Sequence, residues 1–268
     1  MKNIYARSST FFFRISIVSF IVLPIVTYLT YIDFFSNFEP LIFVGVSALF
    51  SSGTGFYLKQ ISEKLPEFTS INPGTAFLMN GFNFQQDVSW YSRLYLVSHE
   101  GEQLFVIEPT TKKPIARFLT VSSVISSGLI IPITYDVMTL NRSRLFSFTV
   151  KNEWKKFRVT IMDEQDNTIG VYLQPWLKSA MKNKGTLFYP NHDVWRQIEA
   201  KNMTGDIDIR DEESRITASY RFGMFPYALH PAFQAIPNNV HIKLGPHIST
   251  NERKVYLGIF YFWLQGYR

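Results

Sequence analysis

The sequence lacks cysteine altogether and is poor in charge. Without cysteine among its 268 residues, it has no disulfides, no thiolate metal ligands and no thiol nucleophile. Charged residues make up 18% and hydrophobic residues 46%, a composition too apolar for a disordered chain. The protein therefore buries a core, sits in lipid, or does both. Its length suits one large domain, or a medium domain with an appendage.

The common signatures of catalysis and metal binding are also missing. We find no GxxxxGK[S/T] phosphate loop, no GxSxG elbow and no HExxH motif. The histidine groups that could meet as a metal site are His192 with Asp193, and His241 with His247. Isolated histidines in loops and strands are more often solvated. We therefore expect no catalytic residues, no cofactor and no metal, and an enzyme acting on a lipid or envelope precursor remains an alternative.

Two long uncharged runs stand in the N-terminal part. Residues 15–32 and residues 41–58 each hold 18 residues without a charge, enough for a helix to cross most of a ~30 Å hydrocarbon core. Only eight residues separate the runs, so we predict a transmembrane hairpin over residues 1–58. A cleaved signal peptide is the alternative for the first run, but that run exceeds a typical apolar h-region and lacks small residues at a cleavage site.

Basic residues around the runs predict an orientation. Lys2, Arg7 and Arg14 precede the first run, none lies between the runs, and Lys59 and Lys64 follow the second. The positive-inside rule then places both termini in the cytoplasm of an integral cell-membrane protein.

Small residues form a row in the second run. Ser47, Ser51 and Gly55 recur every four residues, a pattern that lets another helix approach closely. The row can serve packing against the first run within the hairpin, or it can form a homodimer.

Beyond the second run the pattern changes twice. Residues 59–90 contain two proline-marked breaks and little periodicity, which indicates a linker. From residue 91 onward, apolar and polar residues alternate with a period of two between turn-forming segments. Residues 104–118, 158–173 and 206–220 resemble one another as hairpins. Many short antiparallel strands of this kind predict a mainly β fold, either barrel or sandwich.

The end of the chain departs from this alternation. The segment VYLGIFYFWL, residues 255–264, has no charge and is apolar on every face. Ten residues are too few for a helix to span a bilayer, so we predict a helix surrounded by protein. A helix enclosed by strands means a closed antiparallel β-barrel with a buried hydrophobic C-terminal helix over residues 91–268. An aromatic final strand is the alternative.

This combination resembles the superfamily of the tubby C-terminal domain, the LURP-one-related proteins and the phospholipid scramblases. The resemblance rests on the repeated hairpins, on WKKFRVTIMD (residues 154–163) followed by Ile169-Gly170, and on VYLGIFYFWL. It implies a closed antiparallel barrel around a hydrophobic C-terminal helix. Scramblases have a membrane segment at the chain's end and carry cysteines, whereas here the hairpin is N-terminal and cysteine is missing. Lipid scrambling is therefore not carried over.

Cations lie beside aromatic residues near one predicted strand. The candidate lipid-binding residues are Trp154, Lys155, Lys156, Arg158, Lys178 and Lys182. Near an anionic leaflet each Lys or Arg contributes ~1 kcal/mol to binding, and the alternative is an ordinary solvated strand edge. Residues 59–268 hold 24 Lys and Arg against 19 Asp and Glu, too small an excess to indicate nucleic-acid binding.

These observations favour a membrane-tethered, non-enzymatic binding or regulatory module. Its cytosolic barrel would contact anionic lipid head groups or a protein partner. A protein-binding membrane component of a secretion or antimicrobial-resistance system is the alternative.

Overall fold

The computed structural model describes residues 1–66, 79–89, 93–110, 131–175, 184–200, 206–223, 231–233 and 239–266. Two compact units make up the chain. The first comprises Met1–Glu67 and Asp87–Ser92, and the second comprises Phe68–Gln86 and Arg93–Arg268. Each unit is described by itself below.

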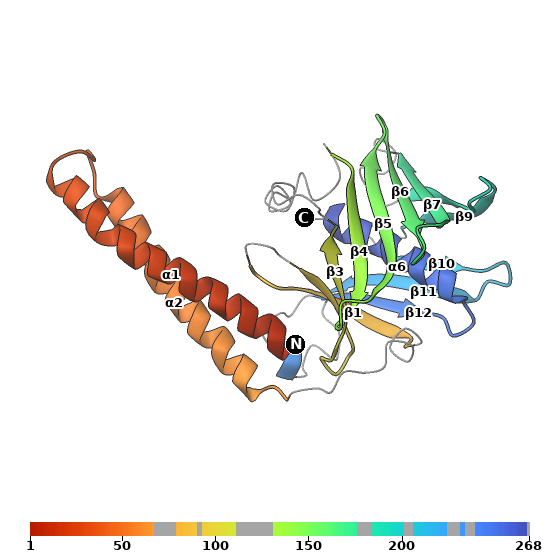
Figure 1. The fold of residues 1–268 in the computed structure, drawn as a ribbon, viewed down its shortest axis with the longest axis horizontal. Helices are drawn as coiled ribbons and strands as arrows, with labels where there is room; N and C mark the ends of the chain where they lie inside the picture. The colour runs from red at the N-terminus through yellow and green to blue at the C-terminus, as the bar shows by residue number, and fades with distance from the viewer. Residues whose placement is uncertain are drawn as a thin grey trace. The chain divides into compact units, whose positions relative to one another are not determined.

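The first unit is a helical hairpin of α1 (Lys2–Tyr31) and α2 (Glu39–Lys64), which lie side by side in Figure 1. Both helices are long and apolar enough to cross a membrane. Only 11% and 17% of their most apolar windows are buried, so neither is packed like the core helix of a soluble protein. The two predicted apolar runs therefore form helices, and the orientation of their ends remains a prediction.

Small residues hold the two helices together. The Ser9 hydroxyl donates to the Gly55 carbonyl at 2.8 Å, and the Ser16 and Ser52 hydroxyl oxygens lie 2.6 Å apart. A Cβ added to Gly55 would lie 3.2 Å from the ring of Phe13. Ser51 and Gly55 are thus buried in the hairpin, where intramolecular packing would place them. The homodimer alternative remains a prediction.

The described residues of the second unit form a nearly closed barrel of twelve strands. Each strand pairs with its neighbours in antiparallel fashion, in the order β10-β11-β12-β1-β2-β3-β4-β5-β6-β7-β8-β9 (Figure 1). The strands are β1 (Gly81–Gln86), β2 (Leu94–Val97), β3 (Gln103–Pro109), β4 (Ile133–Thr139), β5 (Arg144–Asn152), β6 (Lys156–Met162), β7 (Thr168–Pro175), β8 (Lys184–Phe188), β9 (Val194–Glu199), β10 (Ile207–Arg210), β11 (Ile216–Gly223) and β12 (Asn239–Leu244). A short 3-10 turn, η3 (Pro231–Phe233), precedes β12.

Helix and strand extend into the predicted linker, residues 59–90. α2 continues to Lys64, and β1 begins at Gly81. β1 was missed because it offers only Phe82 and Phe84 to the core, too few apolar residues to show a period. The predicted hairpin over residues 104–118 has only its first strand among the described residues, and that strand, β3, pairs with β4.

The C-terminal segment is the helix α6 (Thr250–Gly266), and Val255 to Leu264, apart from Gly258, all belong to the buried hydrophobic core. The prediction of a buried C-terminal helix is confirmed, and the alternative of a final strand was wrong. The Trp263 indole donates to the Gln174 side chain at 2.9 Å, so its buried N–H is satisfied. Gly258 allows close approach, because a Cβ there would lie 3.2 Å from Ile161.

Candidate functional site

The predicted cation–aromatic cluster lies at the tip of the β5–β6 hairpin. The Glu153 backbone N–H donates to the Lys156 carbonyl at 2.8 Å, which closes a turn with Trp154 and Lys155 at its centre. Both central residues have positive φ, +30° and +73°. Positive φ at two central residues characterises the type I′ hairpin turn, where Asn-Gly is the favoured sequence. A tryptophan and a lysine at these positions are strained.

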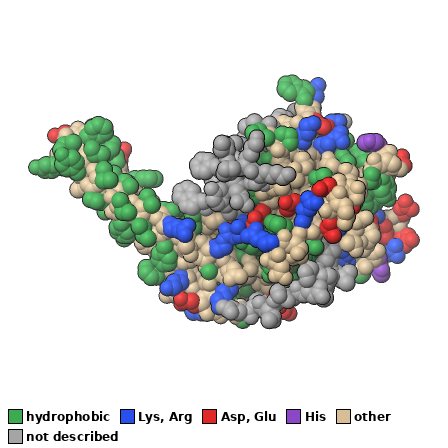
Figure 2. All heavy atoms as spheres, viewed as in Figure 1, with side chains coloured by type: hydrophobic (Ala, Val, Ile, Leu, Met, Phe, Trp, Pro, Cys, Tyr) green, Lys and Arg blue, Asp and Glu red, His purple; other side chains and the backbone are tan. Residues whose placement is uncertain are grey.

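This strained turn displays the tryptophan to solvent. The Trp154 side chain is 86% exposed, the highest value among the exposed large hydrophobic residues of the described chain. Figure 2 shows hydrophobic and basic side chains together at the protruding end of the β5–β6 hairpin. Lys155 is exposed beside the indole, and Lys151 and Lys156 flank the turn on the two strands. The tip therefore combines one large aromatic ring with a local excess of positive charge.

Glu153 organises the cations of the tip. Its carboxylate accepts from Arg158 Nε at 2.9 Å and lies 3.6 Å from Lys151 Nζ and 4.0 Å from Lys156 Nζ. The hydrogen bond from Arg158, assisted by the nearby positive charges, lowers the pKa of the Glu153 carboxyl. Arg158 is thus a partner of Glu153 rather than a free surface cation. In the described part of the predicted cluster, Trp154 and the lysines around it form the tip.

The other two predicted basic residues, Lys178 and Lys182, lie outside the described residues. The next described lysine, Lys184, forms an ion pair with Glu199 at 2.7 Å, between β8 and β9.

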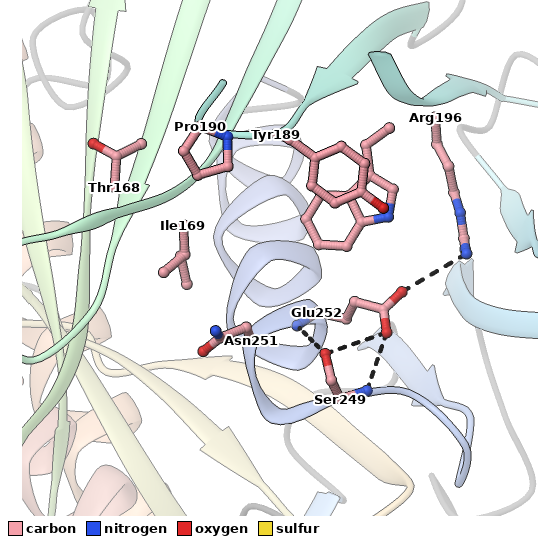
Figure 3. A pocket seen from close by; sticks show the side chains of 9 residues that line it. Thr168, Ile169, Tyr189, Pro190, Arg196, Ser249, Asn251 and Glu252 are labelled. Carbon is pink, nitrogen blue, oxygen red and sulfur yellow. Dashed lines mark hydrogen bonds and ion pairs between the residues drawn. The ribbon is translucent and has the colours of Figure 1, made fainter. Parts of the chain in front are cut away.

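A pocket that sequence reasoning missed opens beside the N-terminal end of α6 (Figure 3). Its volume is about 600 Å³, and its lining consists of Thr168, Ile169, Tyr189, Pro190, Trp195, Arg196, Ser249, Asn251 and Glu252. The Tyr189 and Trp195 rings stack with centroids 4.4 Å apart and an angle of 11° between their planes. They provide an aromatic wall. No spacing in the sequence relates the β8–β9 turn to α6, so the sequence gives no signal for this pocket.

The charged groups of the pocket already bind other groups of the chain. Ser249 and Glu252 form a capping box, in which Ser249 Oγ accepts from the Glu252 N–H and Glu252 Oε2 accepts from the Ser249 N–H. Arg196 donates to Thr217 and to the Tyr256 hydroxyl at 2.8 Å each, and it lies 3.7 Å from Glu252. Burial raises the pKa of Tyr256 to about 12. The pocket suits an uncharged group against the aromatic wall better than acid–base chemistry.

The structure describes the histidine pairs named from the sequence. The backbone N–H of His192 donates to the Tyr189 carbonyl within the β8–β9 turn, and the Asp193 carboxylate accepts from the Asn191 side chain. His241 meets His99 instead of His247. Within the part of the chain that the structure describes, no three His, Cys, Asp or Glu side chains group to hold a metal.

No protein-family model, curated protein or solved structure matches this chain. The resemblance to the tubby and scramblase superfamily therefore remains a prediction, as does the lipid-binding role of the cluster.

Proposed function

We propose that this protein is a membrane-tethered, non-enzymatic module whose barrel docks on an anionic lipid surface through the tip of the β5–β6 hairpin. The exposed Trp154 on its strained turn carries the proposal. Strained backbone persists where the surrounding structure enforces it and is concentrated at functional sites. An indole among lysines suits a membrane interface, where the ring lies at head-group level and each cation contributes about 1 kcal/mol.

The hairpin of α1 and α2 would supply the tether. We propose that both helices cross the cell membrane and that both termini are cytoplasmic, because the basic residues lie outside the connecting turn. Exposed aromatic residues near that turn, Tyr31, Phe34 and Phe38, suit the opposite interface. A reporter inserted between Asn37 and Phe38 should be external, and one fused after Arg268 should be cytosolic. An external signal from the second fusion would contradict this topology.

The absence of cysteine allows a direct test of docking. The full chain with Trp154→Cys is labelled with the polarity-sensitive aromatic dye NBD and reconstituted into liposomes. In phosphatidylglycerol-rich liposomes we expect a blue shift and quenching by nitroxide lipids, both reversed by high salt, because salt screens exposed charges. Phosphatidylcholine liposomes should give neither effect. The matched control is Gln165→Cys, which places the same dye in the β6–β7 turn at the other end of β6.

The lysines are tested in the same assay. Replacing Lys151, Lys155 and Lys156 together by Gln should weaken docking by at most about 3 kcal/mol, roughly 100-fold in the docking constant. Arg158 is kept in this variant because its loss would leave Glu153 without its closest partner. Equal dye responses on charged and neutral lipid, or no effect of the three substitutions, would refute lipid docking and favour a protein partner.

A further inference from the structure

Two histidines from distant parts of the sequence face each other on the outside of the barrel. His99 Nε2, in the turn after β2, lies 3.2 Å from His241 Nδ1 on β12. The side-chain oxygen of Asn83, on β1 between those strands, lies 3.4 Å from the same His241 nitrogen. The sheet register produces this meeting, because Asn83 is paired with His241 on one side and with Val97 on the other.

The local structure holds the His99 ring in place. The Ser98 hydroxyl accepts from the backbone N–H groups of Glu100 and Glu102, which fixes the turn that carries His99. Beneath the ring, a Cβ added to Gly81 would lie 2.9 Å from His99 Nε2. Glycine at this position therefore allows the imidazole to lie directly against β1.

A single hydrogen bond cannot join all three of these atoms. His241 Nδ1 carries either one hydrogen or one lone pair, so it makes one good hydrogen bond, whereas two partners face it. Both distances are at or beyond the upper end of the usual range. The Asn83 side chain is fully buried. A cation that accepts a lone pair from His99 Nε2, from His241 Nδ1 and from the Asn83 oxygen would bind all three atoms at once.

The distances also suit a metal ion. Zinc bound to nitrogen at 2.0–2.1 Å in tetrahedral geometry places two ligand nitrogens about 3.3 Å apart, close to the 3.2 Å observed. Imidazole nitrogen with an amide oxygen favours zinc, copper or nickel over the oxygen-seeking calcium and magnesium.

A nearby positive charge limits the affinity of the site. Lys243 lies two residues from His241 on β12, and its charge opposes a bound cation. We therefore expect the site to exchange its metal.

We propose that His99, His241 and Asn83 form an exchangeable site for a divalent transition metal such as zinc, with its remaining coordination positions open to water or to an external ligand. The site is independent of the lipid-docking tip.

The test uses the full chain, without a histidine tag, in a nonionic detergent. Zn²⁺ binding by titration calorimetry should give one equivalent per chain, and Co²⁺ should show visible absorption bands of a low-coordinate nitrogen site. His99→Ala or His241→Ala should weaken Zn²⁺ binding at least about tenfold and remove the Co²⁺ bands. The control variants His192→Ala and His247→Ala keep both, because these histidines lie elsewhere.

Two gain-of-affinity variants guard against misfolding as the explanation. Lys243→Gln removes the opposing charge, and Asn83→Asp supplies a carboxylate ligand, so each should tighten Zn²⁺ binding several-fold. The proposal is overturned if the wild-type chain binds no Zn²⁺, if His192→Ala or His247→Ala abolishes binding, or if both gain variants leave the affinity unchanged.

Discussion

Arg158 Nε donates to the carboxylate of Glu153 at 2.9 Å, and this ion pair fixes the base of the turn that displays Trp154. The same carboxylate lies within 4.0 Å of Lys151 and Lys156. Glu153 therefore has two opposing effects. It stabilises the turn by pairing with the surrounding cations, and it reduces the positive charge that the turn offers to an anionic surface.

Glu153→Gln should separate these two effects. Removing one negative charge should tighten docking on phosphatidylglycerol-rich liposomes by about 1 kcal/mol, roughly fivefold, as measured with NBD at residue 154. The variant should lose at most about 1 kcal/mol of stability, as expected for a partly exposed ion pair. Glu213→Gln removes an equal charge from the β10–β11 turn and should leave docking unchanged. An equal gain in both variants would show that net charge, and not the tip, determines binding.

The lowered pKa of Glu153 predicts how its contribution varies with pH. A carboxyl whose pKa is lower in the folded chain than its ordinary 4.5 stabilises the fold above that value. The contribution is lost as pH falls below 4.5 through the folded pKa. Thermal unfolding of wild type and Glu153→Gln should therefore differ at pH 6, and the difference should shrink toward zero as the pH falls below 4.5. A constant difference would contradict the assigned ion pair.

Local patterns in the sequence were enough to predict the architecture. The alternation in β6 survives in the structure, where Val159 and Ile161 are fully buried. The ten uncharged residues from Val255 form a helix inside the strands, because an element that is apolar on every face must be buried on every face. Periodicity and composition are local properties, so one sequence suffices to read them.

The sites depended on long-range pairing that one sequence does not show. Asn83 and His241 meet because β1 pairs with β12, although 158 positions separate them. The stacked Tyr189 and Trp195 face α6 only because the β8–β9 hairpin closes over its N-terminal end. Trp154 was identified only because it stands beside lysines in the sequence. Its positive φ was unexpected, since neither tryptophan nor lysine favours this turn.

The buried helix makes the barrel sensitive to charge at its centre. Leu257 is 1% exposed in α6, so Leu257→Lys would bury an unpaired ammonium group at a cost of several kcal/mol. This loss is a large share of the stability of a typical domain, and we expect the barrel to unfold or to melt at a much lower temperature. Asn251→Lys, at an exposed position of the same helix, should cost less than about 1 kcal/mol. Similar melting of both variants in detergent would contradict the enclosed position of α6.

The packing of the helical hairpin can be tested with introduced cysteines. Ser16→Cys with Ser52→Cys should cross-link within one chain under mild oxidation, because the two hydroxyl oxygens lie 2.6 Å apart. Gly55→Val should reduce this cross-linking, since a Cβ at that position already lies 3.2 Å from Phe13. Gly53→Val is the matched control, because nothing lies within 4 Å of a Cβ added there. Cross-linking between chains instead of within them would favour the homodimer.

The strained turn predicts opposite changes in stability and docking. Replacing Trp154 by Asn and Lys155 by Gly installs the sequence preferred for positive φ at both positions. We expect the barrel to gain on the order of 1 kcal/mol of stability, since left-handed backbone costs a non-glycine residue roughly that amount. The same variant loses the indole and one cation, so energy transfer from a dye on Gln165→Cys to an acceptor lipid should report weaker docking. Trp154→Asn alone keeps Lys155, so its docking should be weaker than that of the wild-type chain and stronger than that of the double variant. If the double variant were both more stable and equally well docked, the strain at Trp154 would have no part in membrane binding.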